Sequence, residues 1–571
     1  VGALLANRFG THIMNVAILF FIIVFEDIGV IEQLRFAFPY APGNTAYSQM
    51  NGYGIFGDAG VCYAVMWAIL SLFFVVAGIW FWNRGSLRVF AKRFSVKNPQ
   101  LNVIGKFVAL ILLVGFCYMQ NYIVKNEQKT GNFKTDDQQD AEDAEYEKRF
   151  KYIETVNQPY VCALDLTIDI SPDIRKADYS FDMMLTNRGN TAIDSLYLSL
   201  KDFVTINSLQ LADTRLSPAW NNPKHYQSAY ALTTPIAVGD TVHLKGSCTL
   251  QYIGFSSQDA QEALVYNGSF LQEDIVPRIG YDSDKELEEN RIRSEQGLNK
   301  LQSRMDQIND ENSLKNDALY SRALWGNTTI RLHSGGGQTA YASGEFKGTE
   351  NINNKQYLVY KTATPAAMNW YIGSARYETF KKTLNNGTKL KVLYDAHHPY
   401  NLEPIAGSAN DGIAFLEQML GNYPYSQLII SEIPHYNEDD FYTAPNLIAV
   451  SERHCWVADG RRKKDLSYIY YTTCREIFKQ WIKQNVHVAD VQGAEMILTA
   501  IPEAYGLALV KEKFGDETLQ IYLDKKHERY SKGRGNEANV EPSLVYADKP
   551  YSMRVSAFVV MNTRTNLNDR I

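Results

Sequence analysis

The stretch from Arg475 to Trp481 places a glutamate between two cations at a spacing that fits one face of a helix. In the zinc-binding helix pattern H-E-x-x-H, histidines at i and i+4 hold the metal and the glutamate activates water. Glu476 keeps the position of that glutamate, whereas Arg475 and Lys479 stand where the histidines would be. Because two cations repel Zn²⁺, the pattern predicts a helix that retains a vestigial general base and has lost its metal ligands.

The other histidines offer no substitute set of ligands by spacing. Three are scattered along the chain: His435, His454 and His487. His397 and His398 precede a proline, and we expect them to cap or fill a turn. Without a metal, Glu476 could act only on ordinary water, which is too weak a nucleophile, so we expect it to pair with Arg475 or Lys479.

Composition limits the class of protein. The chain has 571 residues and a net charge of −6, which allows two or three domains and does not favour nucleic acid as a partner. The apolar residues crowd into the first 125 positions. The sequence starts at Val1 rather than Met, and we expect a fragment of a longer chain, truncated at the start and at the C-terminal end.

Three N-terminal segments have membrane-spanning character: Ile13–Ile31, Val61–Trp82 and Val103–Val124. The first is the weakest because Glu26 and Asp27 interrupt it; the alternative for each is a buried core helix. Between the second and third, residues 83–106 carry six basic residues and no acid. Such a loop is expected to be cytoplasmic, which places everything after Val124 outside.

The rest of the chain divides into three predicted parts. Residues 125–158 are acid-rich and predict a solvated linker that turns into a charged helix. Residues 159–406 contain alternating segments such as Cys162–Ile170, which predict an all-β, sandwich-like domain; within it, Ser283–Asn316 is expected to be a charged, solvated excursion. Residues 407–571 predict a mainly α domain, with a helix over Leu466–Ile482 that carries the motif.

Four cysteines lie outside the predicted spans, in a compartment where disulfides can form. Cys162 and Cys248 are both on predicted sandwich strands, and a disulfide between them is one expectation. Cys455 and Cys474 bracket the approach to the motif helix. The alternative is that all four are free, buried thiols.

Several segments resemble one family along nearly the whole chain. The sequence is similar to bacterial proteins that join an ABC-type transporter permease to a membrane alanyl aminopeptidase-like domain, which is a thermolysin-like gluzincin. The segments that carry this resemblance are Tyr47–Gly54, Ile279–Asp282, Lys285–Leu287, Tyr423–Tyr436, Phe441–Glu452, Val491–Ala494 and Tyr505–Lys513.

This resemblance implies how the catalytic positions match. The histidine ligands match Arg475 and Lys479, the base matches Glu476, and the third ligand, a glutamate, best matches Thr499, with Leu498 and Ala500 as alternatives. The tyrosine that stabilises the tetrahedral intermediate matches Arg554. The remaining candidates for the old binding cleft are Glu432, Glu452 and Asn446. No cofactor is then expected, and the resemblance implies a catalytically degenerate member of the family.

The first hypothesis is thus a membrane-anchored pseudoenzyme that binds a peptide or protein, or couples to transport, without hydrolysis. It would lie in a bacterial inner membrane with its large C-terminal part in the periplasm. One alternative is an active, zinc-dependent aminopeptidase; another is a scaffold subunit of an ABC-type transporter. No G-x-x-x-x-G-K-[ST] motif is present, so an ATPase would be a separate subunit, and three spans imply a longer parent chain or an oligomer.

The cations left in the cleft allow two interpretations. One Glu476 cannot neutralise Arg475, Lys479 and Arg554, and unpaired buried charge is costly. Either neighbouring acids complete a salt-bridge network, or the cleft stays hydrated and attracts anions. The acids available for the network are Glu432, Glu452, Glu495 and Glu503.

Overall fold

The computed structural model describes residues 8–27, 47–81, 103–130, 134–255, 262–301, 305–311, 313–318, 322–437, 440–534 and 546. The chain forms two compact units. The first comprises Val1–Ala141 with Tyr252–Glu262, and the second comprises Glu142–Gln251 with Ala263–Ile571. The basic loop at residues 84–97 and Arg554 lie outside the described residues.

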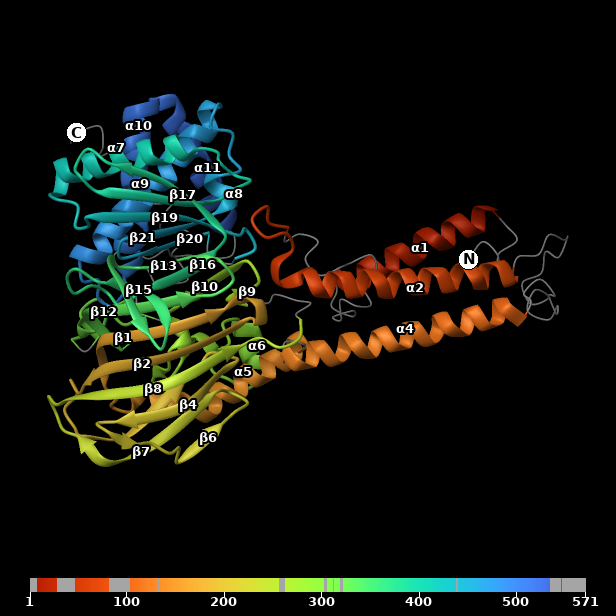
Figure 1. Ribbon diagram of the computed structural model, residues 1–571, viewed down its shortest axis with the longest axis horizontal. Helices are drawn as coiled ribbons and strands as arrows, with labels where there is room; N and C mark the ends of the chain where they lie inside the picture. The colour runs from red at the N-terminus through yellow and green to blue at the C-terminus, as the bar shows by residue number, and fades with distance from the viewer. Residues whose placement is uncertain are drawn as a thin grey trace. The chain divides into compact units, whose positions relative to one another are not determined.

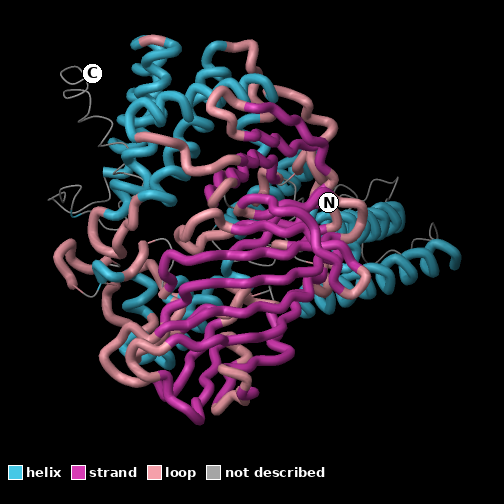
Figure 2. The backbone as a smooth tube through the Cα atoms, turned by 60° about the vertical axis from the view of Figure 1, so that its left-hand side comes forward, coloured by secondary structure: helices cyan, strands magenta, loops and turns pink. Residues whose placement is uncertain are grey.

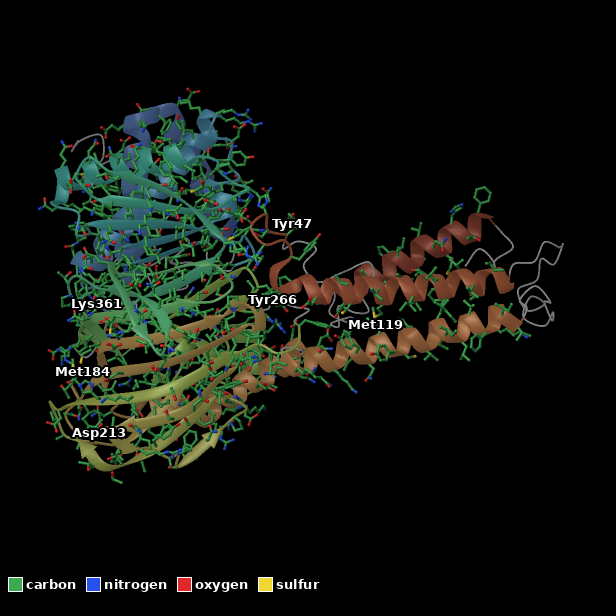
Figure 3. All side chains as sticks on the ribbon, viewed as in Figure 1. Tyr47, Met119, Met184, Asp213, Tyr266 and Lys361 are labelled. Carbon is green, nitrogen blue, oxygen red and sulfur yellow. The ribbon has the colours of Figure 1, made fainter. Side chains whose placement is uncertain are left out.

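The first unit is helical (Figure 1). It contains α1 (Arg8–Asp27), η2 (Gly54–Phe56), α2 (Gly57–Phe81) and α4 (Val103–Thr130). By length and composition, two segments could cross a membrane, Gly54–Ile79 and Val103–Lys129, whereas the apolar part of α1, Phe9–Phe21, is shorter. Met119 of α4, labelled in Figure 3, packs against a small core cluster of the unit. The predicted second and third spans are therefore helices of sufficient length.

The predicted acidic linker is mostly helical, because α4 continues to Thr130 and α5 spans Asp136–Phe150. It is also not wholly solvated, since Tyr146 and Phe150 of α5 are buried and Tyr146 stacks on Tyr281. After η3 (Lys151–Thr155) the first strand begins.

The excursion predicted at Ser283–Asn316 is exposed at most of its described residues, as expected, but a buried arginine anchors it. It contains α6 (Asn290–Glu295) and the short turns η6 (Ser283–Lys285) and η7 (Ser313–Lys315). The buried Arg293 donates from Nη1 and Nη2 to the two carboxylate oxygens of Glu147, each at 2.7 Å. A bidentate pair of this kind fixes the segment against α5.

Three β-sheets make up the middle of the chain, shown as magenta strands in Figure 2. The eight-stranded sheet has the order β14-β15-β12-β1-β2-β8-β4-β5. Its strands are β1 (Tyr160–Ser171), β2 (Lys176–Thr186), β4 (Val204–Leu211), β5 (Thr214–Arg215), β8 (Thr241–Gln251), β12 (Ala323–Ser334), β14 (Glu345–Ile352) and β15 (Lys355–Lys361). Alternation explains β1, where Leu164, Leu166, Ile168 and Ile170 are buried in turn.

The two smaller sheets have four strands each. One contains β9 (Leu264–Val265), β10 (Gly268–Gln272), β13 (Thr339–Ala342) and β16 (Tyr371–Ala375), and the turn η5 (Glu273–Ile275) follows β10. The other contains β3 (Ile193–Ser199), β6 (Trp220–Asn222), β7 (Gln227–Ile236) and β11 (Arg278–Ile279). The β-rich architecture was predicted; the parallel pairing of β1 with β12 was not.

A five-stranded sheet in the order β17-β18-β19-β21-β20 opens the last part of the chain. Its strands are β17 (Tyr377–Thr383), β18 (Lys389–Asp395), β19 (Gln427–Ile433), β20 (Phe441–Ala444) and β21 (Leu447–Ser451). The central strands β18, β19 and β21 are parallel, and β17 and β20 are antiparallel edges. Residues 407–571 are mainly helical, as predicted, and they also contribute β19, β20 and β21 to this sheet. The boundary predicted at residue 407 falls inside α7 (Leu402–Leu420).

Helices pack against this sheet (Figure 1). After α7 they are α8 (Glu452–Cys455), α9 (Lys463–Asn485), η8 (Met496–Ala500), α10 (Ile501–Phe514) and α11 (Asp516–Arg534). The contact between α7 and α9 is close at Gly412, where an added Cβ would lie 3.2 Å from Cys474 Sγ. Ile469, Cys474 and Ile477 bury one side of α9 in the core, which leaves its other side for polar residues.

The cysteines are free, and the disulfide expected between Cys162 and Cys248 is wrong. Cys162 is on β1 and Cys248 on β8, and β2 lies between them. Two strand spacings separate their backbones by roughly 10 Å, beyond the reach of a disulfide. Cys455 and Cys474 are buried thiols of the helical core.

Candidate functional site

Three cations occupy one stripe of α9. Arg475, Lys479 and Lys483 are four residues apart, so a helix of 3.6 residues per turn aligns them. The stripe faces the edge strand β20, because the Arg475 guanidinium lies 4.6 Å from the centre of the Phe441 ring. Farther along, Lys483 Nζ donates to the Thr443 carbonyl at 2.8 Å. The helix therefore presents Arg475 and Lys483 to β20.

Glu476 is fully engaged by protein groups. Arg475 donates to its Oε1 from Nε and from Nη2, both at 2.7 Å. Thr443 Oγ1 donates to its Oε2 at 2.6 Å. Burial favours the protonated acid, but the charges of Arg475 and Lys479 and these hydrogen bonds outweigh it and lower the pKa of Glu476 to about 2. Glu476 is thus a buried carboxylate in an ion pair, as expected, and is not poised to take a proton near pH 7.

The other two cations of the stripe differ. Lys479 is partly buried, and within the described residues it forms no hydrogen bond or ion pair. Burial, together with the charge of Lys479, lowers the pKa of Lys483 to about 7. Burial also raises the pKa of Glu273 to about 7, and the Tyr442 hydroxyl donates to this carboxylate at 2.6 Å. The stripe carries more positive charge than Glu476 can neutralise.

Zinc does not fit this face. A zinc site needs neutral imidazoles or anionic donors around a shared position. Arg475 has no lone pair to offer, and its guanidinium holds the carboxylate of Glu476. The ammonium group of Lys479 adds a second positive charge on the same side of the helix.

The residue matched to the third zinc ligand gives no support to a metal either. Thr499 lies in η8, which is a π-helical turn, and its hydroxyl donates to Glu495 Oε2 at 2.9 Å. Glu503, one turn later, pairs with Lys526. Although burial opposes it, the charges of Glu476 and Glu503 raise the pKa of Arg475 above its ordinary value. Glu503 is thus a second carboxylate whose charge favours the charged form of Arg475.

The other residues predicted for the cleft lie elsewhere. Glu432 Oε1 lies 2.5 Å from His398 Nδ1, and Glu452 Oε1 lies 3.2 Å from His435 Nδ1, so neither acid completes a network with Arg475. Asn446 has a φ of 63° and follows Pro445 in the turn between β20 and β21. Its side chain donates to the Gln427 carbonyl at 2.9 Å, which makes it a turn residue.

Sequence reasoning missed Thr443 and Lys483, which contact the site from β20 and from the next turn of α9. Lys483 could have been found, because it continues the four-residue spacing of Arg475 and Lys479. Thr443 could not, because only the packing of β20 on α9 brings it to Glu476.

Comparisons with known proteins give structural neighbours only. No protein-family model and no curated protein matches the sequence. Among solved structures, the chain is similar to an M1 zinc metallopeptidase from Deinococcus radiodurans, at 13% identity and a TM-score of 0.48, over 71% of this chain and 81% of that one. A Glu-to-Ala mutant of that peptidase bound to a Tyr-Ser-Ala substrate matches at 13% identity and a TM-score of 0.46, over 70% of this chain and 80% of that one. Values this low assign neither a family nor an activity to this chain.

Proposed function

We propose that this chain is a membrane-anchored, aminopeptidase-like protein that binds the carboxylate of a peptide or protein and does not hydrolyse it. A single observation carries the proposal: Arg475 and Thr443 donate hydrogen bonds to both carboxylate oxygens of Glu476. A general base must reach the water that it activates. A carboxylate held by three donors, with a pKa of about 2, has little basicity to contribute.

A carboxylate ligand is supported by the charge left on the stripe. Arg475 is satisfied by Glu476, whereas Lys479 forms no hydrogen bond or ion pair among the described residues. One turn along the helix, burial and the positive charge of Lys479 both disfavour the charged form of Lys483. An anion beside Lys479 would relieve this repulsion, and a peptide that carries one could lie along the edge strand β20.

The binding test compares two peptides that differ in one charge. A fluorescent tripeptide with a free C-terminal carboxylate and its C-terminal amide are titrated against the purified full chain. We expect the acid to bind at least 10-fold more tightly and Lys479→Met to remove this preference. The matched control is Lys525→Met, which removes an exposed lysine of α11 and leaves the preference unchanged.

Equal binding of acid and amide by the unsubstituted chain would contradict the carboxylate proposal. Zinc-dependent cleavage of either peptide would contradict the absence of hydrolysis. In both cases the aminopeptidase-like arrangement would need another role.

Membrane anchoring is the second part of the proposal, supported by the two long apolar helices α2 and α4. The permease-type origin of these helices, the inner-membrane location and the association with a separate ATPase belong to it as well. Single cysteines at Ser95 and Thr130 test the orientation with an impermeant thiol reagent in intact cells, in a background with Cys117 replaced. We expect labelling at Thr130 and none at Ser95, because residues 83–106 are basic. The reverse pattern would invert the orientation.

A further inference from the structure

Three buried side chains with metal-binding donors meet at one edge of the five-stranded sheet. They come from the carboxyl ends of its three parallel strands: His398 follows β18, Glu432 lies near the end of β19, and Glu452 directly follows β21. One donor atom from each lies within 4.8 Å of the other two. The exposed fractions are 1% for His398, 0% for Glu432 and 2% for Glu452. Ligand sites of open α/β sheets commonly lie at this edge.

Strand register brings the two glutamates close together. Glu432 of β19 aligns with Val450 of β21 in the parallel pairing. Glu452 comes two residues after Val450 and begins α8, which directly follows β21. Val450 belongs to the core that α7 and α9 form with the sheet.

Backbone donors orient both carboxylates. The Asp395 amide donates to Glu432 Oε2 at 2.7 Å, which turns Oε1 toward His398 Nδ1 at 2.5 Å. The His435 amide donates to Glu452 Oε1 at 3.1 Å. Metal-binding carboxylates are typically held in this way by an outer layer of hydrogen bonds. The Asp395 and His435 amides thus hold one oxygen of each carboxylate.

The cluster concentrates carboxylates. Besides Glu432 and Glu452 it contains the buried Asp395, whose backbone amide donates to Glu432. Burying several carboxylates together is costly unless positive charge compensates them. Imidazole with two carboxylates is a donor set that suits Zn²⁺ or Mn²⁺.

We propose that His398, Glu432 and Glu452 form a binding site for a divalent transition-metal cation. The site is separate from the α9 stripe, where the donors do not fit a metal. Glu432 pairs with His398 and Glu452 with His435, whereas Arg475 pairs with Glu476.

The test uses the purified full chain, stripped with a chelator and titrated separately with ZnCl₂ and MnCl₂ by calorimetry, with elemental analysis after dialysis. We expect about one tightly held ion per chain for at least one of the two metals. Glu452→Gln should weaken its binding at least 10-fold, and the matched control Glu512→Gln, which removes an exposed acid of α10, should leave it unchanged. If Glu476→Gln removes the ion and Glu452→Gln does not, the metal is on α9, and both this proposal and the proposed function fail.

A second measurement covers the case in which Glu452→Gln does not fold. Metal that binds only the folded chain must raise its unfolding temperature. We expect the stripped wild-type chain to unfold several degrees earlier than the same chain reloaded with the bound metal. The proposal is overturned if neither metal is retained after dialysis and neither shifts the unfolding temperature, because the cluster is then only a hydrogen-bonded ion cluster.

Discussion

The stripe on α9 and the cluster at the end of the parallel strands use buried charge in opposite ways. On α9, Glu476 is surrounded by cations, and Arg475 and Thr443 occupy its two oxygens. At the sheet edge, Glu432 and Glu452 are buried as well, but their ion-pair partners are His398 and His435. The stripe places cations around one carboxylate, whereas the cluster gathers two carboxylates beside an imidazole.

This difference shows that a motif and the chemistry once expected of it can separate. On α9, the residues on either side of Glu476 are the cations Arg475 and Lys479, which are not metal donors. At the sheet edge, an imidazole and two carboxylates come together although no sequence motif links them. Charges from both places act on the buried thiol of Cys455. Burial, together with Glu432 and Glu476, raises the pKa of this thiol to about 12, and the charge of Arg475 opposes the rise.

Arg475→Met should cause the largest loss of stability. It leaves the buried Glu476 without the cation that holds Oε1, and breaking a buried pair in this way costs about 3–5 kcal/mol. Lys479→Met should cost less than about 1 kcal/mol, because Lys479 forms no ion pair in the described part of the chain. Urea unfolding followed by tryptophan fluorescence measures both. Equal losses would mean that Lys479 is structural and not available to a ligand.

Acid should weaken the α9 stripe through Glu476. Its pKa is about 2 in the folded chain against an ordinary value of 4.5. A lowered carboxyl pKa contributes stability above pH 4.5 that is lost as the pH falls toward 2, here about 3 kcal/mol. Unfolding midpoints of the wild type and of Glu476→Gln at pH 5, 4 and 3 measure this contribution. A gap between the two proteins that stays constant over this range would show that the pKa is not lowered.

Lys483→Met tests the other end of the stripe. The pKa of Lys483 is about 7, below its ordinary value of 10.5, so between these values the unfolded chain binds a proton that the folded chain does not. Stability of the wild type should therefore rise relative to Lys483→Met as the pH increases, by about 2 kcal/mol between pH 7 and 9. Lys525→Met serves as the control with no such trend. A flat difference across this window would place Lys483 in contact with water.

Asn446 should give the smallest effect. At a φ of 63°, alanine is strained and glycine is not, and both substitutions remove the hydrogen bond to Gln427. Asn446→Ala should therefore be about 1 kcal/mol less stable than Asn446→Gly. Neither should alter binding of the fluorescent tripeptide, because Asn446 shapes the turn and not the site. A loss of binding in both variants with unchanged stability would return Asn446 to the cleft.

The sequence was sufficient for the local elements. Alternation in Cys162–Ile170 predicted β1, and the apolar spacing in Leu466–Ile482 predicted α9, because each pattern depends on near neighbours in the chain. The cations on either side of Glu476, Arg475 and Lys479, were also readable directly, since they follow from residue type.

What the sequence did not provide is the order in which strands pair. Both cysteine strands were predicted, but β2 separates β1 from β8. The strands β17 and β18 fall within the predicted β-rich domain. In the structure, however, β18 pairs with β19 and belongs to the sheet of the next part. His398, Glu432 and Glu452 are far apart in sequence, and only the parallel pairing of three strands brings them together.

The central claim is that the α9 face holds no catalytic metal, and a peptidase assay tests it most directly. The purified full chain, supplied with Zn²⁺, is incubated with unblocked tripeptides, and released amino acids are quantified against Glu476→Gln. We predict no release above the rate of the variant, whether or not a metal is bound by His398, Glu432 and Glu452. Zinc-dependent release that disappears in Glu476→Gln would contradict the account and identify Glu476 as a working base.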